Sequence, residues 1–161
     1  MVGVMVASSL RSAAAAALLV VAAPAAAADP ALPPAAREAA AAVDAFHAAL
    51  RRGDTKAASD LLTDEALVFE EGRAERSKSE YQARHLGADA AFSRAVRTET
   101  VRRRGDSAGH FAWIASENRA RGSFRGAAVD RVVDETMVLR RIGGRWKIVH
   151  IHWSSAAASV E

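Results

Sequence analysis

The chain has 161 residues, no cysteine and a formal net charge of +3, from 22 basic and 19 acidic residues. Without cysteine a disulfide framework is excluded, so stability must come from a hydrophobic core. The charge is too small and too dispersed for a nucleic-acid-binding face, which needs clustered basic residues. The arginine run over 102–104 suits a solvated strand end instead, and we expect no nucleic-acid partner.

Residues 1–28 have the pattern of a secretory signal peptide. Arg11 precedes an apolar, alanine-rich run over 13–23, and small residues over 26–28 predict cleavage before Asp29. The run is shorter than the roughly 20 residues that cross a bilayer. We therefore expect a periplasmic or secreted protein that makes no membrane contact after cleavage. The mature chain would have 161 − 28 = 133 residues, enough for one domain.

Helical patterns follow a linker over 29–34. A helix is expected from Pro34 to about Arg52, with apolar residues at helical spacing on one stripe and Gly53 at its end. Asp54 can cap a short second helix. Two packed helices therefore begin the expected domain, which covers residues 35–155 and leaves 156–161 as a tail.

A short hairpin comes next, with strands expected over 66–71 and 74–76. Ser77 and Glu80 then have the spacing of a capping box, in which each side chain accepts a hydrogen bond from a free backbone amide. A third helix is expected to start there. Its apolar stripe consists of Tyr81, His85, Ala88 and Phe92.

The remainder of the chain predicts β-structure, because its runs are rich in β-branched and aromatic residues. Tight turns are expected at Gly105-Asp106 and Gly143-Gly144, so the strands form an antiparallel meander. The fold class is α+β: a curved antiparallel sheet packed on three N-terminal helices, which makes a cone with a cavity. The four long strands are expected over 97–104, 108–120, 128–141 and 145–154.

Two segments carry a family resemblance: Phe69-Glu70-Glu71-Gly72 to Tyr81, and the hairpin with the final strand over 143–154. Both resemble the SnoaL-like branch of the nuclear transport factor 2-like superfamily, and the second is also similar to the association domain of calcium/calmodulin-dependent kinase. The resemblance covers residues 35–155. It implies a cone-shaped α+β domain, often a dimer through the outer face of its sheet, with a pocket between helices and sheet.

That superfamily includes isomerases, cyclases, dehydratases, carriers and oligomerisation modules, so the fold selects no activity. Its ketosteroid isomerases combine a carboxylate base with a tyrosine and a protonated acid. Tyr81 is the one tyrosine here, and no motif places an aspartate opposite it. The resemblance therefore transfers no catalytic residue.

The final strand presents His150 and His152 on one face, because side chains alternate along a strand. We expect this face to point inward, since buried imidazoles need partners or a ligand. The expected function is small-ligand binding, without a cofactor. The predicted pocket is lined by Tyr81, His85, Trp113, His150 and His152.

Three alternatives remain open. Both histidines can be core residues with ordinary partners. A pocket histidine can act as general acid or base in a cyclase- or isomerase-type enzyme, which requires a carboxylate or tyrosine hydroxyl beside His150 or His152. A metal site is the weakest alternative, with His85, His150, His152 and Glu70 as ligands.

A homodimer is expected through Val149, Ile151 and Trp153, on the opposite face of the final strand.

Overall fold

The computed structural model describes residues 32–158, so the predicted signal peptide lies outside the described residues. These residues form helices α1 (Pro34–Arg52), α2 (Thr55–Asp60), α3 (Lys78–Arg84) and α4 (Leu86–Ala95). They also form strands β1 (Leu62–Glu70), β2 (Arg73–Glu75), β3 (Val96–Ala108), β4 (Phe111–Phe124), β5 (Ala127–Ile142) and β6 (Arg145–Ala157). No helix within residues 32–158 has the length and apolar character that a membrane span requires.

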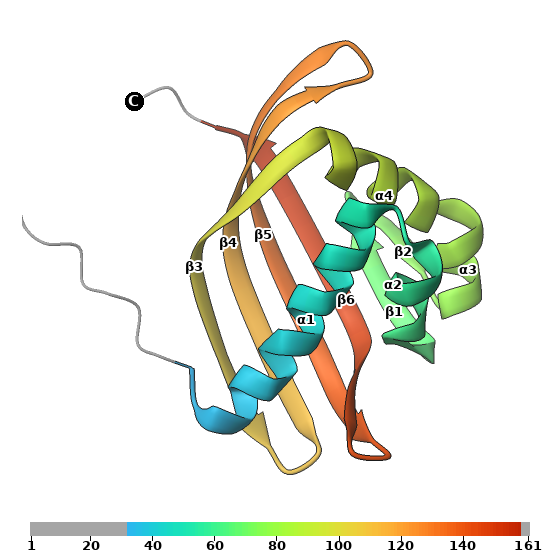
Figure 1. Ribbon diagram of the computed structural model, residues 1–161, viewed down its shortest axis with the longest axis vertical. Helices are drawn as coiled ribbons and strands as arrows, with labels where there is room; N and C mark the ends of the chain where they lie inside the picture. Colours follow the sequence, from blue (N-terminus) through green and yellow to red (C-terminus); the bar gives the residue numbers. More distant parts are fainter. Residues whose placement is uncertain (1–31, 159–161) are drawn as a thin grey trace, which may run out of the picture.

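The six strands make one curved, open sheet in the order β2-β1-β6-β5-β4-β3, and the helices lie over its concave face (Figure 1). Strands β3 to β6 form the predicted antiparallel meander, whereas β1 pairs with β6 in parallel. The α+β fold class is confirmed. The parallel β1–β6 pair was not predicted, because a pairing between distant segments leaves no local signal in the sequence.

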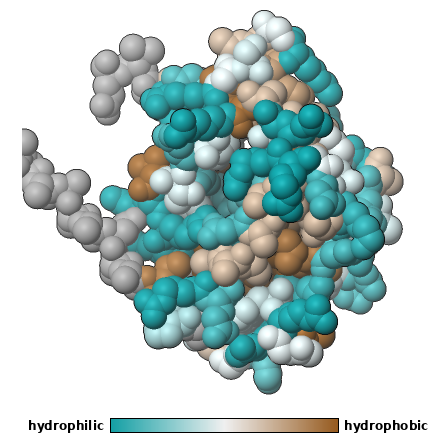
Figure 2. Space-filling view, viewed as in Figure 1, coloured by the Kyte–Doolittle hydropathy of each residue, from teal (hydrophilic) through white to brown (hydrophobic). Residues whose placement is uncertain are grey.

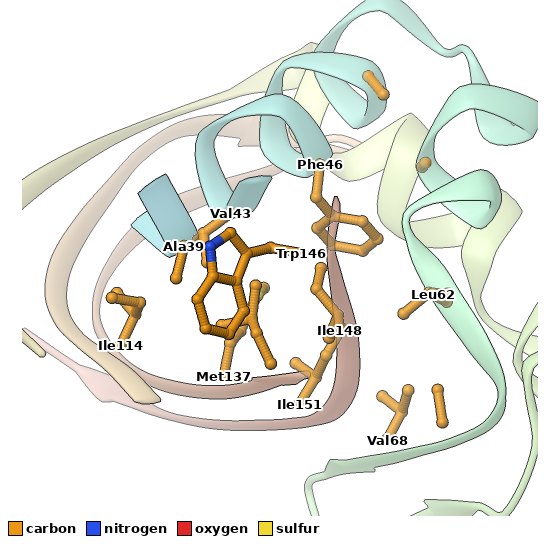
Figure 3. Packing of buried hydrophobic residues seen from close by; sticks show 14 of the residues in the cluster. Ala39, Val43, Phe46, Leu62, Val68, Ile114, Met137, Trp146, Ile148 and Ile151 are labelled. Carbon is orange, nitrogen blue, oxygen red and sulfur yellow. The ribbon is translucent and has the colours of Figure 1, made fainter. Parts of the chain in front are cut away.

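Helix α1 supplies the centre of the core. Pro34 lies in its first turn, where its fixed backbone suits a helix, and Gly53 ends it with a φ of 73°. Val43 and Phe46 are fully buried on its inner stripe. Figure 3 shows this stripe packed against the concave side of the sheet, opposite Met137, Trp146, Ile148 and Ile151.

The predicted helix caps are present. Asp54 Oδ1 accepts a hydrogen bond from the Ala57 amide at 2.9 Å, and Ser77 Oγ accepts one from the Glu80 amide at 3.1 Å. The expected third helix, however, divides into α3 and α4. The break lies at His85, where the backbone leaves helical geometry with a φ of −121°. At this break the imidazole contacts Glu75 of β2.

The predicted turn at Gly105-Asp106 is wrong, since Gly105 lies inside β3 opposite Ile114. A Cβ at Gly105 would lie 2.6 Å from Ile114 Cδ1 and 2.7 Å from the Trp113 carbonyl oxygen. The glycine therefore allows close packing between β3 and β4. In a sequence, a glycine needed for close packing cannot be distinguished from a glycine in a turn. The turn itself is at Gly109, with a φ of 60°. The predicted turn at Gly143-Gly144 is confirmed, between β5 and β6.

Strand β6 contains a β-bulge that changes which side chains face the core. Leu139 pairs with Ile148 and Val138 with His150, so Val149 is an extra residue without a partner on β5. One extra residue inverts the alternation of every side chain beyond it. Trp146 and Ile148 face inward before the bulge, and Ile151 and Trp153 face inward after it.

The bulge corrects two predictions. His150 and His152 share a face, as expected, but it is the outer face of the sheet, so the predicted inward orientation is wrong. The expected dimer surface is also wrong, because Ile151 is fully buried in the core and Trp153 packs against it.

The molecule's helical side, shown in Figure 2, carries mainly hydrophilic residues around scattered apolar ones.

Candidate functional site

A cavity of about 470 Å³ lies between α1, α4 and the inner face of the sheet. This volume is within the range of small-molecule sites. The lining combines apolar side chains, such as Leu50, Phe92 and Val133, with charged ones from several elements. Helices α1 and α4 converge over the sheet at this end of the fold (Figure 1). The cavity is the predicted pocket between helices and sheet.

One end of the cavity contains two carboxyl groups, Glu70 from β1 and Asp89 from α4. The fully buried Tyr81 donates a hydrogen bond to Asp89 Oδ2 at 2.6 Å. Burial, together with the charges of Asp89 and Glu71, raises the pKa of Glu70 to about 7. Burial also raises the pKa of Asp89, against the opposing effect of its hydrogen bond with Tyr81. This end of the cavity can therefore hold a proton near neutral pH.

His85 adjoins the same end and has fixed partners. Its Nδ1 contacts Oε1 of Glu75, whose side chain is only 2% exposed. Arg73 Nη1 donates to His85 Nε2 at 3.5 Å, which places the ring hydrogen on Nδ1. The second oxygen of Glu75, Oε2, makes no hydrogen bond within residues 32–158. His85 therefore lines the cavity as an oriented imidazole.

A second polar group lies across the cavity. His47 on α1 is 27% exposed, and its Nε2 lies 2.7 Å from Oε2 of Glu135, which is only 2% exposed. Trp153 Nε1 donates to the same oxygen at 2.7 Å. Burial acts to raise the pKa of Glu135, but the hydrogen bond and charge of His47, the hydrogen bond of Trp153 and the charge of Arg103 together lower that pKa. Glu135 is consequently an ionised, buried carboxylate.

Strand register aligns these groups in one row of the inner face. Glu70 on β1 lies opposite Trp153 on β6, which lies opposite Glu135 on β5. The row continues to Ser116 on β4 and Arg103 on β3. Neighbouring strands are about 4.8 Å apart, so the backbone positions of Glu70 and Glu135 are separated by about 10 Å. Trp153 stands between the two carboxyl groups.

Of the five predicted pocket residues, the structure places only His85 on the cavity wall. Tyr81 is buried just behind Asp89. Trp113 and His150 occupy one row on the outer face, where Trp113 is 44% exposed and His150 Nδ1 donates to the Leu67 carbonyl oxygen at 3.1 Å. The predicted pocket composition is therefore wrong for Trp113, His150 and His152. The cause is the bulge at Val149 and the outward phase of β4.

The proposed metal ligands cannot meet in one site. His85 and Glu70 line the cavity, whereas the sheet separates them from His150 and His152. Within residues 32–158 no cluster of three or more histidine, aspartate or glutamate side chains has the arrangement that a metal ion requires. The metal-site prediction for this set is wrong.

Three cavity residues were missed by sequence reasoning. Asp89 follows Tyr81 by two helical turns, but the helix break at His85 decides that they meet. Glu135 lies between Val133 and Met137 on the inward phase of β5, and this alternation was an available signal for a buried carboxylate. His47 follows the fully buried Phe46, which gave no indication of a partner on β5.

The cavity residues all lie within the span that matches a family model. The model for the SnoaL-like domain matches residues 39–158. A comparison with curated proteins found no match. The solved structure of a candidate ketosteroid isomerase from Shewanella frigidimarina is 33% identical, with a TM-score of 0.69, over 73% of this chain and 94% of that chain.

Two more distant structures share the fold. A candidate dehydratase of the NTF2-like family from Streptomyces avermitilis is 20% identical, with a TM-score of 0.67, over 77% of this chain and 97% of that one. A candidate calcium/calmodulin-dependent protein kinase II association domain from Xanthomonas campestris is 21% identical, with a TM-score of 0.66, over 80% of this chain and 94% of that one. The chain therefore belongs to the SnoaL-like branch of the nuclear transport factor 2-like superfamily.

Proposed function

We propose that the chain binds a small, mostly apolar molecule with an oxygen function in this cavity and transfers a proton on it. Glu70 is the acid–base group. The observation that carries the proposal is a carboxyl group inside a partly apolar cavity, beside the Tyr81–Asp89 pair, with a pKa near neutrality. A catalytic acid or base works best when its pKa lies near the operating pH.

The reaction class is proton exchange at a carbon next to a carbonyl group. The Glu70 carboxylate takes the proton from carbon, and the electron pair of the broken C–H bond moves to the carbonyl oxygen as the enolate forms. The resulting Glu70 carboxyl returns a proton to the same or a neighbouring carbon. The balance of atoms and charge requires no further reactant.

The similarity to the candidate ketosteroid isomerase supports an isomerase-type reaction. An isomerase that used His150 or His152 as its acid–base group would need a carboxylate or tyrosine hydroxyl beside that ring. His150 instead contacts the Leu67 carbonyl and the Phe69 ring, so that version fails. His85 and His47 have the carboxylate partners. Binding without catalysis remains the second candidate, supported by the cavity alone.

The test uses two probes. 2-Tetralone, a flat ketone with acidic C–H bonds, is incubated with the protein in D₂O, and deuterium uptake is followed by mass spectrometry. 2-Naphthol, which resembles its enol, is titrated by fluorescence. Wild-type protein is expected to bind 2-naphthol and accelerate exchange, and Glu70→Gln to abolish the acceleration. Glu65→Gln is the control, because Glu65 is exposed on the same strand. Binding without exchange would leave a carrier, and absence of both would refute the proposal.

We also propose export, which the pattern over residues 1–28 supports. A cleaved chain would begin at Asp29, three residues before the first described residue. Cleavage there would leave the folded residues 32–158 intact. The cavity would then meet ligands outside the cytoplasm.

The partner we propose is a second copy of the chain, bound through the outer face of the sheet. Apolar side chains are exposed there: Phe69 is 40%, Trp113 44%, Val132 44% and Ile142 43% exposed. Such a patch on one face is typical of an interface. The four residues belong to β1, β4 and β5 and lie on the face of the sheet opposite the helices.

Charges along β5 support a twofold arrangement. Asp134 precedes and Arg140 follows Met137 by three residues, on the same outer phase of the strand. A twofold axis across the strands at Met137 places Asp134 of one copy opposite Arg140 of the other. The same axis places Val132 opposite Ile142. The face is therefore complementary to itself in charge and in apolar content.

A further inference from the structure

We infer that Arg125, in the turn between β4 and β5, binds a carboxylate group of the ligand at the mouth of the cavity. The inference rests on the proposed proton transfer at Glu70 and names its substrate class, a ketone whose carbon chain ends in a carboxylate. The ketone lies beside Glu70, and the carboxylate projects to Arg125. Arg125 determines specificity and takes no part in the proton transfer.

The backbone at Arg125 is unusual for an arginine. Arg125 and Gly126 form a two-residue turn between the paired ends of β4 and β5, with φ values of 52° and 81°. Such a turn requires a positive φ at both positions, which asparagine and glycine adopt at lower cost than arginine. Within residues 32–158 the other non-glycine residue with a positive φ is Glu71, at the same position of the turn between β1 and β2. Both residues line the cavity, so each strained backbone carries a side chain that can meet a ligand.

The side chain of Arg125 lies at an aromatic cluster on the cavity wall. Its guanidinium carbon is 5.0 Å from the centre of the Phe124 ring, and this ring contacts Phe92 of α4 edge to face, with centroids 5.3 Å apart. All three side chains line the cavity. The contact with Phe124 holds the positive charge in place. No carboxylate within residues 32–158 pairs with Arg125, so its N–H donors are available to a ligand.

The other four arginines that line the cavity have different explanations. Three have partners among the described residues: Arg73 with His85, Arg103 with Asp44, and Arg131 with Ser155 and Glu71. Arg51 lies in the last turn of α1, where a positive charge stabilises the helix dipole. Neither explanation applies to Arg125. A planar guanidinium can donate two parallel hydrogen bonds to a carboxylate, which makes a carboxylate the group that fits best.

Helix α4 sets the distance between the two ends of the ligand. Asp89, which shares one end of the cavity with Glu70, and Phe92 are about one turn apart on this helix. The contacts from Phe92 to Phe124 and on to Arg125 extend this line past the end of the helix. Arg125 therefore lies roughly 10 to 15 Å from the proton-transfer end, on a helical rise of about 1.5 Å per residue. In Figure 1 the β4–β5 hairpin extends past the other strands where α4 meets β3.

The experiment compares ketones that differ only in charge. Three methyl ketones of increasing length, 6-oxoheptanoate, 8-oxononanoate and 10-oxoundecanoate, each compete with 2-naphthol, as do their primary amides. At least one acid is expected to bind wild-type protein about threefold to tenfold more tightly than its amide, as for one charge-assisted hydrogen bond near the surface. This advantage is expected to fall between about 20 and about 500 mM salt, because ions screen exposed charges.

Three variants assign the advantage to one side chain. Arg125→Gln is expected to remove the advantage of the acids and to leave the binding of the amides unchanged. Arg125→Lys, which keeps the charge, is expected to retain part of the advantage. Arg121→Gln is the matched control, because it removes the same charge from an exposed position of β4, beside Asp130.

Equal binding of acid and amide at all three lengths would overturn the inference, and so would an advantage that survives in Arg125→Gln. An equal loss for acids and amides in Arg125→Gln would show that Arg125 only supports the hairpin, which would also overturn it. Deuterium exchange on the amides that is lost in Glu70→Gln would show that the proposed function stands even where the inference fails. Failure of 2-naphthol and all six ketones to bind would instead refute the proposed function itself.

Discussion

Trp153 donates its indole hydrogen to Glu135 over 2.7 Å, from β6 to β5 on the inner face of the sheet. This contact depends on the phase of β6 after its bulge. With the opposite phase, His152 would occupy the inner face and Trp153 the outer one. The bond therefore depends on the bulge in β6, which decides whether Trp153 or His152 reaches the cavity.

Insertion of one alanine between His150 and Ile151 is expected to destabilise the domain severely, whereas deletion of Val149 is expected to be tolerated. The insertion reverses the alternation beyond it and would move Ile151 and Trp153 out of the core. Loss of these two large apolar side chains corresponds to about 3 to 6 kcal/mol in the free energy of unfolding. Deletion of Val149 removes the bulge but leaves Ile148, Ile151 and Trp153 on the inner face, so it is the control for a change in strand length. Urea denaturation measures both variants, and an insertion variant as stable as the deletion variant would contradict the importance of strand phase.

Glu70→Gln is expected to stabilise the protein at high pH only. The pKa of Glu70 is raised to about 7 in the folded state, so ionisation opposes folding as pH rises. Below the unfolded value of about 4.5 both states are protonated and the variant gains nothing. Between pH 4.5 and 7 the gain grows, and at pH 8 it reaches about 1 to 2 kcal/mol after allowance for partial exposure. Thermal unfolding at pH 4, 6 and 8 tests this, and a gain independent of pH would contradict it.

Gly105→Ala and Gly87→Ala are expected to change stability in opposite directions. A Cβ at Gly105 would collide with Ile114 Cδ1 and a backbone oxygen, at a loss of about 1 to 3 kcal/mol. A Cβ at Gly87, the second residue of α4, meets nothing within 4 Å, and alanine there reduces the conformational entropy of the unfolded chain, a gain of about 0.4 to 1 kcal/mol. Chemical denaturation of both variants measures the difference. Equal effects would show that strand packing at Gly105 is looser than described.

Charge reversal tests the proposed dimer. Asp134→Arg is expected to reduce the dimer fraction, because it would place two arginines opposite each other at each end of β5. Asp134→Arg combined with Arg140→Asp restores complementarity and is expected to restore dimerisation. Light scattering after size-exclusion chromatography gives the mass of each variant. A monomeric wild-type chain at micromolar concentration would refute the dimer.

Export is tested by expressing the complete chain in a bacterial host and sequencing the mature N-terminus from the periplasm. The expected first residue is Asp29. Replacement of Ala28 by Phe is expected to block processing, because signal peptidase requires a small residue there. Full-length protein that remains in the cytoplasm would contradict this prediction.

The sequence determined the features that depend on neighbours along the chain. The caps at Asp54 and Ser77, the helix end at Gly53 and the turn at Gly143-Gly144 each follow from a residue's own backbone preferences or from side chains within a few positions. Alternation and composition gave four long strands and therefore the α+β class. These signals are local, so a single sequence was sufficient for them.

Only the tertiary structure decided which faces meet. The bulge at Val149 arises from pairing between β5 and β6, and no residue in this part of the sequence predicts it. The break at His85 brings Asp89 to Tyr81, and the row that joins Glu70, Trp153 and Glu135 requires the parallel β1–β6 pair. A one-residue change of phase exchanges the two faces of a strand, so the candidate site depends on long-range register rather than on composition.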